Sequence, residues 1–267
     1  MFEEHPLSRI VHLSLKVDDY RRTGDFYQKM FNFRDVDTKR TRDHISRHMT
    51  DGAIDFTVMS YDAGTTSAES TASGEGPCIH HFAVEVEDIE KATRDIHALG
   101  CEVVSDPGVI PVKFIAPGGT VVELVPVGRY NFDSAGRKIS RITHISLKVD
   151  DFQAVGDFYK SVFGFRDTKT KRTRDHISRH MTDGAIDFTV MQYDPDTTSA
   201  ESRAAGEGPC IHHFAVEVED IEQSTRDIRA LGCEVVSDPG VIPVKFRDPG
   251  GIVSELVELG RYTRLVS

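Results

Sequence analysis

Residues 39–59 read KRTRDHISRHMTDGAIDFTVM, and the same letters recur without change at residues 171–191. A second run, GEGPCIHHFAVEVEDIE, occupies residues 74–90 and recurs at 206–222 with the same spacing. Repeats of this length indicate duplicated structural units. We therefore predict two homologous domains, at 1–130 and 141–267, joined by a polar linker at 131–140.

A weaker repeat lies inside each half. Residues 143–151 read THISLKVDD and residues 212–220 read HHFAVEVED, so both place alternating apolar residues after a histidine and before an acidic residue. Alternation predicts a strand, and the acidic residues predict a helix N-terminus. Each half should hold two modules, at about 8–62 and 78–128 in the first half and about 141–194 and 210–260 in the second.

The order of elements in a module follows from the same patterns. We expect strands at 10–17, 44–50, 53–61, 79–86 and 120–125, and helices at 20–31 and 89–99, the second ended by Gly100. With one further strand in the first module and two further strands in the second, the order is βαβββ. The segment 62–77, rich in Gly, Ser and Thr, is predicted to be a loop that covers a substrate.

Four such modules are predicted to pair into two open, cupped β-barrels, an α+β fold. The sequence leaves the pairing open, because a cup could combine two modules of one half or one module from each half.

Composition narrows the function classes. A net charge of −11 with dispersed Lys and Arg argues against nucleic acid and anionic membranes as partners. No apolar run is long enough to span a bilayer and the first residues do not resemble a signal peptide, so we expect a cytoplasmic protein.

The single cysteines Cys78, Cys101, Cys210 and Cys233 predict reduced, buried thiols. Nucleophile-elbow, Walker and dinucleotide-binding motifs are missing from the sequence.

The residues most suggestive of chemistry are histidines and carboxylates at corresponding strand positions. His12 and His81 lie near the start of the two modules, Glu123 lies in the last strand, and Asp55 alternates with Ile54, Phe56 and Val58. Their counterparts are His144, His213, Glu255 and Asp187. Singly, each is more often a solvated or hydrogen-bonded side chain. Together they predict a divalent-metal site, since two His and one carboxylate suit Fe(II) and leave open positions.

These motifs carry a family resemblance. The early His, IDFT, HHFAVEV, and the closing APGGTVVEL or DPGGIVSEL resemble the vicinal oxygen chelate superfamily of glyoxalases, epimerases, extradiol dioxygenases and bleomycin-resistance proteins. The resemblance implies metal ligands at His12, His81 and Glu123, and again at His144, His213 and Glu255. Asp55 and Asp187 fall where glyoxalase-like members place a fourth ligand. We choose His81 over His80, because His81 aligns with His12 and leaves HFAVEV parallel to HLSLKV. His80 would then face the other side of the sheet.

The resemblance implies several activities. We favour an Fe(II)-dependent, extradiol-type dioxygenase acting on a small oxygenated or aromatic substrate. The alternative is a glyoxalase-like lyase or an epimerase that works through a metal-bound enediolate with Ni, Co, Zn or Mn. A metal-free binding or resistance protein is a second alternative. Homodimerisation stays open.

Further candidates for acid–base or substrate-binding roles come from the His-rich strand and from the end of each half. In the first half they are His44, Arg47, His48, Lys113 and Tyr130, and in the second half they are His176, Arg179, His180, Lys245 and Tyr262. The strand could equally be a polar edge that faces solvent.

Overall fold

The computed structural model describes residues 8–132 and 140–262 and contains two copies of one arrangement of strands and helices. In the first half the elements are β1 (Arg9–Lys16), α1 (Tyr20–Phe31), β2 (Arg34–Arg40), β3 (His44–Thr50), β4 (Asp55–Tyr61), α2 (Ala68–Ala72), β5 (Cys78–Val86), α3 (Ile89–Ala98), β6 (Glu102–Val103), β7 (Val112–Ile115) and β8 (Val121–Pro126). In the second half they are β9 (Ile142–Lys148), α4 (Phe152–Phe163), β10 (Arg166–Arg172), β11 (His176–Thr182), β12 (Asp187–Tyr193), α5 (Ala200–Ala204), β13 (Cys210–Val218), α6 (Ile221–Ala230), β14 (Glu234–Val235), β15 (Val244–Arg247) and β16 (Val253–Glu258).

Each half forms one mixed, eight-stranded sheet. The strand order is β2-β3-β4-β1-β5-β8-β7-β6 in the first half, and the second half repeats it as β10-β11-β12-β9-β13-β16-β15-β14. The central strands β1 and β5 are antiparallel, and each has a parallel neighbour from its own module, β4 and β8. The sheets are open and stop short of closed barrels, and four βαβββ modules are present as predicted.

Local sequence signals explain where the elements begin and end. The carboxylate of Asp19 accepts hydrogen bonds from the backbone N–H groups of Arg21 and Arg22 and so caps α1. Asn32 ends the helix in the left-handed conformation, with φ 58°, where Gly164 stands in the second half. In β4 the alternate residues Ile54, Phe56 and Val58 enter the core, as the pattern of the strand predicts.

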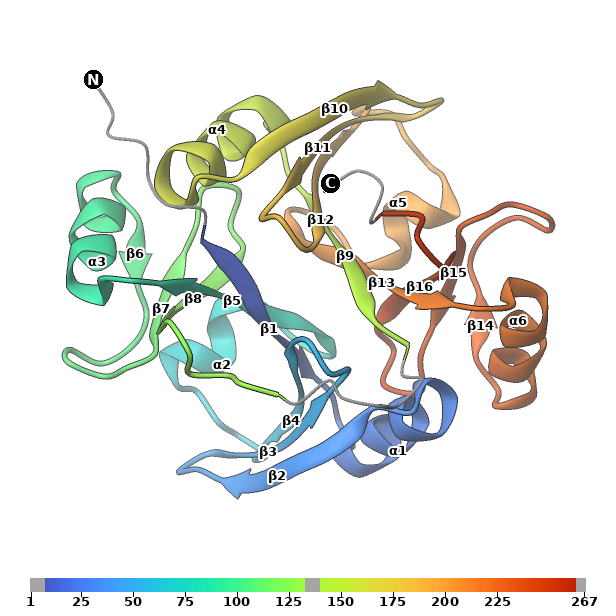
Figure 1. Ribbon diagram of the computed structural model, residues 1–267, viewed down its shortest axis with the longest axis horizontal. Helices are drawn as coiled ribbons and strands as arrows, with labels where there is room; N and C mark the ends of the chain where they lie inside the picture. The colour runs from blue at the N-terminus through green and yellow to red at the C-terminus, as the bar shows by residue number, and fades with distance from the viewer. Residues whose placement is uncertain (1–7, 133–139, 263–267) are drawn as a thin grey trace.

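The hydrophobic core joins the two halves, because each first helix packs on the strands of its own half and also contacts the other half (Figure 1). The ring of Tyr27 on α1 lies 4.6 Å from Phe56 of its own half and 6.0 Å from Phe214 of the other half. Reciprocally, the ring of Tyr159 on α4 lies 4.6 Å from Phe188 of its own half and 6.1 Å from Phe82 of the other half. The two halves therefore bury their aromatic surfaces together.

Hydrogen bonds that turn carboxylates accept from backbone N–H groups reinforce this junction. The carboxylate of Asp51 accepts a hydrogen bond of 2.7 Å from the backbone N–H of Ile142, and that of Asp183 accepts one of 2.6 Å from Ile10. Each buried carboxylate thus satisfies a backbone N–H at the start of the central strand in the other half.

Some expectations differ from the structure. Segment 62–77 contains the short helix α2, whose N-cap Ser67 accepts a hydrogen bond from Ser70. All four cysteines are free, but only Cys101 is buried, while the other three are half-buried. The predicted linker at 131–140 lies mostly outside the described residues. Among those residues, none of the helices is long and apolar enough to cross a membrane.

Candidate metal centre

A single cross-strand row of side chains defines the site in the first half. The pairing of β4, β1, β5, β8 and β7 places Asp55 beside His12, His12 beside Ala83, Ala83 beside Glu123, and Glu123 beside Lys113. Directly opposed residues in neighbouring strands share a face of the sheet. The row therefore has one acidic and one basic side chain on each side of the small residue Ala83.

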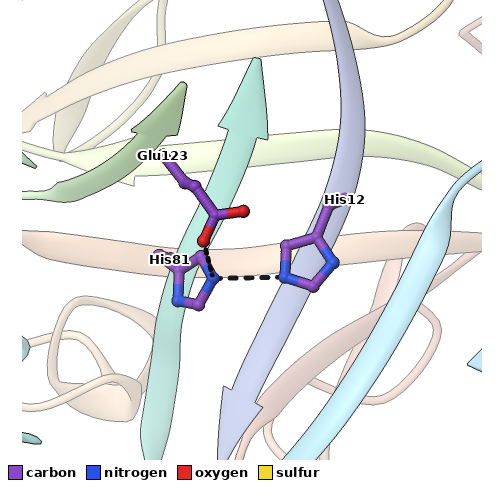
Figure 2. Close-up of side chains that lie close together, drawn as sticks. All are labelled: His12, His81 and Glu123. Carbon is purple, nitrogen blue, oxygen red and sulfur yellow. Dashed lines mark hydrogen bonds and ion pairs between the residues drawn. The ribbon is translucent and has the colours of Figure 1, made fainter. Parts of the chain in front are cut away.

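His81 joins this row from two residues before Ala83 in β5. Its Nε2 lies 3.1 Å from Nε2 of His12 and 3.3 Å from Oε2 of Glu123, and the three side chains converge from three adjacent strands (Figure 2). One ligand atom from each residue lies within 4.8 Å of the others, and all three residues are buried.

The second half repeats the arrangement with His144, His213 and Glu255. There Nε2 of His213 lies 3.4 Å from Oε2 of Glu255. Each triad comes entirely from one half, so the two modules of that half form each cup. The alternative in which His12 joins His213 and Glu255 is excluded by this pairing.

Asp55 lies behind His12, on the side away from the triad. Its Oδ2 accepts a hydrogen bond of 2.6 Å from Nδ1 of His12, and it also contacts Nδ1 of His48 and the hydroxyl of Thr57. Burial alone would raise the pKa of Asp55, but the hydrogen bonds from His12 and His48 outweigh burial and lower it. An ionised Asp55 holds the proton of His12 on Nδ1 and leaves Nε2 free to bind a metal. Asp187 makes the same contact with His144, at 2.7 Å.

The remaining ligand candidates have the charge states that a metal requires. Burial lowers the pKa of His81 to about 4, partly offset by Glu123, so the imidazole is neutral at pH 7. Glu123 is fully buried, which would raise its pKa, but the ammonium of Lys113 and His81 lower it. The Nζ of Lys113 lies 3.2 Å from Glu123 and 3.3 Å from Glu69.

The donor set fits a divalent transition metal. Neutral imidazole nitrogens and one carboxylate are ligands for Fe, Zn, Ni, Co and Mn. Oε1 of Glu123 is buried and has no hydrogen-bond partner among the described residues, a state that usually indicates a missing water or ion. The residues present would therefore suit such an ion.

Both triads lie in cavities. The cavity in the first half has a volume of about 750 Å³ and the one in the second half about 420 Å³. In the first cavity the triad is surrounded by the candidates His44, His48, Lys113 and Tyr130, and also by Ser46, Thr57 and Met59. In the second cavity the corresponding candidates are His176, His180, Lys245 and Tyr262. The His-rich strand thus turns its histidines into the cup.

The closing tyrosines Tyr130 and Tyr262 each stack on a ligand candidate. The Tyr130 ring lies 5.2 Å from His12 and the Tyr262 ring 4.5 Å from His144, each at an angle of 9°. The hydroxyl of Tyr262 also donates a hydrogen bond of 3.1 Å to Oε1 of Glu255.

Arg47 and Arg179 do not join either cup. Arg47 forms ion pairs of 2.7 Å with Asp25 on α1 and 2.6 Å with Asp35 on β2. It crosses α1 at Gly24, where an added Cβ would lie 2.7 Å from Nη1 of Arg47. Arg179 repeats the contacts with Asp157 and Asp167. Both arginines therefore fasten a helix to a strand.

Sequence reasoning missed His80, Glu69 and the asymmetry of the two cavity mouths. His80 is buried and contacts His81, although alternation predicts that it faces away. At the mouth, Asp37 in the first half is replaced by Lys169 in the second half, a difference that comparison of the repeats could have found.

The chain belongs to the Glyoxalase/Bleomycin resistance protein/Dioxygenase superfamily, whose family model matches residues 9–124 and 141–256. This confirms the resemblance drawn from the motifs. The chain is similar to Lactoylglutathione lyase GLX1 of Arabidopsis thaliana, with 26% identity covering 94% of this chain and 91% of the relative.

Two solved structures share the fold. A variant of 4-hydroxymandelate synthase from Streptomyces coelicolor has a TM-score of 0.68 at 17% identity, covering 93% of this chain and 92% of that one. The Mn(II)-bound glyoxalase from Novosphingobium aromaticivorans has a TM-score of 0.66 at 16% identity, covering 96% and 86%.

Proposed function

We propose that the protein is a divalent-metal enzyme with two sites per chain, which binds a small substrate through two neighbouring oxygen atoms. The observation that carries the proposal is the convergence of His12, His81 and Glu123 at the base of an open cavity. A bound ion would polarise the substrate oxygens and, if it is Fe(II), hold O2 beside the substrate.

Among the activities of this kind, we favour an Fe(II)-dependent, extradiol-type dioxygenase. Asp55 contacts the far nitrogen of His12, which supports three protein ligands and an orienting role for this carboxylate. Two histidines and one carboxylate are the ligand set of non-haem Fe(II) oxygenases, in which the open positions accept substrate and O2.

The side chains around the triad would bind and orient the substrate. Lys113 places a partly buried ammonium beside Glu123, where it can neutralise an ionised substrate oxygen. Tyr130 covers one face of His12 and would contact an aromatic ring in the cavity. His48 contacts Asp55 and Thr57 and can hold a proton near the substrate.

A second candidate is a glyoxalase-like lyase or an isomerase. Lys113 favours it, because a partly buried ammonium 3.2 Å from the carboxylate of Glu123 could stabilise charge that develops when a proton is removed next to a carbonyl. The similarity to a lactoylglutathione lyase over nearly the whole chain also supports it.

One experiment separates these functions. The protein is purified without oxygen, its metals are measured, and O2 uptake is recorded with a panel of catechols and hydroquinones. About two Fe per chain with catechol-dependent uptake would establish the dioxygenase. Ni, Co, Zn or Mn with no uptake, together with formation of lactoylglutathione when methylglyoxal and glutathione are supplied, would establish the lyase. The double variant H81A/H213A is the inactive control for both assays.

A further inference from the structure

His80 lies at an irregularity in the central strand. In the pairing of β1 with β5, Ser14 pairs with His81 and Leu15 pairs with Ile79, so His80 is the extra residue of a β-bulge. A bulge changes the direction of neighbouring side chains and often lies next to a functional site. Here it brings the rings of His80 and His81 to a centroid distance of 5.0 Å in a T-shaped contact.

The hydrogen bonds of His80 determine where each ring carries its proton. Nε2 of His80 lies 2.9 Å from the backbone carbonyl oxygen of Glu69, which can only accept, so this nitrogen carries hydrogen. Nδ1 of His80 lies 2.7 Å from Nδ1 of His81. For Nε2 of His81 to bind a metal, neutral His81 must carry its hydrogen on Nδ1 and donate it to His80.

The second half repeats this chain of contacts. Nε2 of His212 lies 2.8 Å from the carbonyl oxygen of Glu201, and Nδ1 of His212 lies 2.8 Å from Nδ1 of His213. His212 is again the extra residue of a bulge, between the pairs that Ile211 and His213 make.

Glu69 also contacts a second ligand candidate, Glu123, indirectly through Lys113. Its carboxylate lies 3.3 Å from Nζ of Lys113, which lies 3.2 Å from the ligand candidate Glu123. The short helix α2 therefore contacts two of the three ligand candidates through one intermediate side chain each: its backbone acts through His80 and its side chain through Lys113.

We propose that His80 and His212 are positioning residues, which fix the proton of His81 and His213 on Nδ1 and tie these ligands to the α2 and α5 segments. Each contacts Nδ1 of its neighbouring ligand candidate. Asp55 and Asp187 contact Nδ1 of His12 and His144 in the same way. The inference rests on the proposed metal site. Such partners of a ligating histidine typically contribute about 10- to 100-fold to metal affinity.

The test uses three substitutions of His80 and one of His212 in the full chain, with Co(II) alone as the probe. H80F removes both polar atoms and keeps the ring. H80N places an oxygen near the position of Nδ1 and so keeps an acceptor for His81, whereas H80Q places its amide near the position of Nε2 and keeps only the contact with Glu69. The unchanged second site in the same chain is the internal control.

Titration followed by Co(II) absorption should give two tight sites in the unchanged protein. H80F and H80Q should weaken one site by roughly 10- to 100-fold and leave the other tight, while H80N keeps both sites tight. Nitrogen NMR should show the His81 proton on Nδ1 in the unchanged protein and in H80N. H212F should weaken the other site.

Equal Co(II) affinities of H80F, H80Q and H80N would overturn the positioning role. An acceptor near the position of Nδ1, which only H80N keeps, would then make no difference to the affinity. Failure of the unchanged protein to bind Co(II) would instead overturn the proposed metal site. If H80F does not fold, the comparison of H80N with H80Q still decides.

Discussion

The hydroxyl of Tyr27 donates a hydrogen bond of 2.7 Å to the carboxylate of Asp248, which lies 221 positions further along the chain. The same hydroxyl lies 2.8 Å from the hydroxyl of Ser254. This buried cluster joins α1 to the second sheet. In the reciprocal position the hydroxyl of Tyr159 has a longer contact, 3.3 Å from Thr120. The two junctions are therefore chemically unequal.

Removal of the two tyrosine hydroxyls should show this inequality. Y27F should lower the free energy of unfolding by about 1–3 kcal/mol, because it leaves a buried carboxylate with fewer donors. Y159F, the matched control, should cost less, because its weaker contact is with another neutral hydroxyl. Urea unfolding at neutral pH measures both. Equal losses would mean that the contact with Asp248 contributes little.

Asp248 should also make stability depend on pH. Burial raises its pKa to about 6, although hydrogen bonds from Tyr27 and from backbone N–H groups oppose the increase. An unfolded Asp loses its proton near pH 4, so between about pH 4 and 6 the folded state holds a proton that the unfolded state has released. Stability must then fall as pH rises through this window.

The variant D248N isolates this effect, since it keeps an acceptor and does not titrate. The free energy of unfolding of the unchanged protein, minus that of D248N, should decrease by up to about 3 kcal/mol between pH 4 and pH 7. Chemical unfolding at several pH values measures the difference. A difference that is constant with pH would contradict the assignment of the proton to Asp248.

Periodicity and repetition predicted most of the fold. The alternation in IDFTVM correctly sends Ile54, Phe56 and Val58 into the core, and the acidic residues Asp19 and Asp88 before the two expected helices are their N-caps. The side chains of the proposed triads could also be selected from the sequence, since equivalent strand positions lie at one edge. These signals are local, and each strand carries its own.

The remaining features depend on contacts that no local pattern encodes. The bulge at His80 breaks the alternation that placed this residue on the opposite face, because the extra residue shifts the register. Asp55 matches the position of a fourth ligand by sequence, yet its side chain contacts Nδ1 of His12. The contact of Tyr27 with Asp248 and the pairing of modules are long-range, so the sequence left them open.

Loss of one ligand in each half should remove metal in steps. H81A should reduce Co(II) binding from two ions to one per chain, and H81A/H213A should abolish tight binding while circular dichroism shows a retained fold. The physical reason is that each triad has a single ligand from β5 or β13. H97A, which removes an exposed histidine on α3, should still bind two ions. Unchanged metal content in the double variant would refute the ligand assignment.

Asp55 offers a test of its orienting role. D55A should weaken Co(II) binding in the first half by about 10- to 100-fold, because His12 loses the acceptor for its Nδ1 proton. D55N keeps an oxygen and should lose less. The absorption spectrum of saturated D55A should match that of the unchanged protein. A spectrum of lower coordination number would instead identify Asp55 as a fourth ligand.

The two cavity mouths should differ in their preference for charged substrates. Asp37 and Lys169 occupy equivalent positions, opposite His48 and His180, and Asp37 lies 3.8 Å from Lys39. The same exchange leaves the second cavity with two neighbouring lysines, Lys169 and Lys171, and a more positive mouth. An anionic group on the substrate should therefore bind better in the second site.

The exchange variants D37K and K169D test this preference in chains with one working site, obtained with H213A or H81A. D37K should improve the KM of a carboxylated catechol by about 2- to 5-fold, and K169D should worsen it similarly, because exposed charges contribute up to about 1 kcal/mol. The KM of an uncharged catechol should not change, and added salt should reduce the effect. Equal changes in KM for the charged and the uncharged catechol would show that the side chain acts through its shape and not its charge. The two sites would then share one preference with respect to substrate charge.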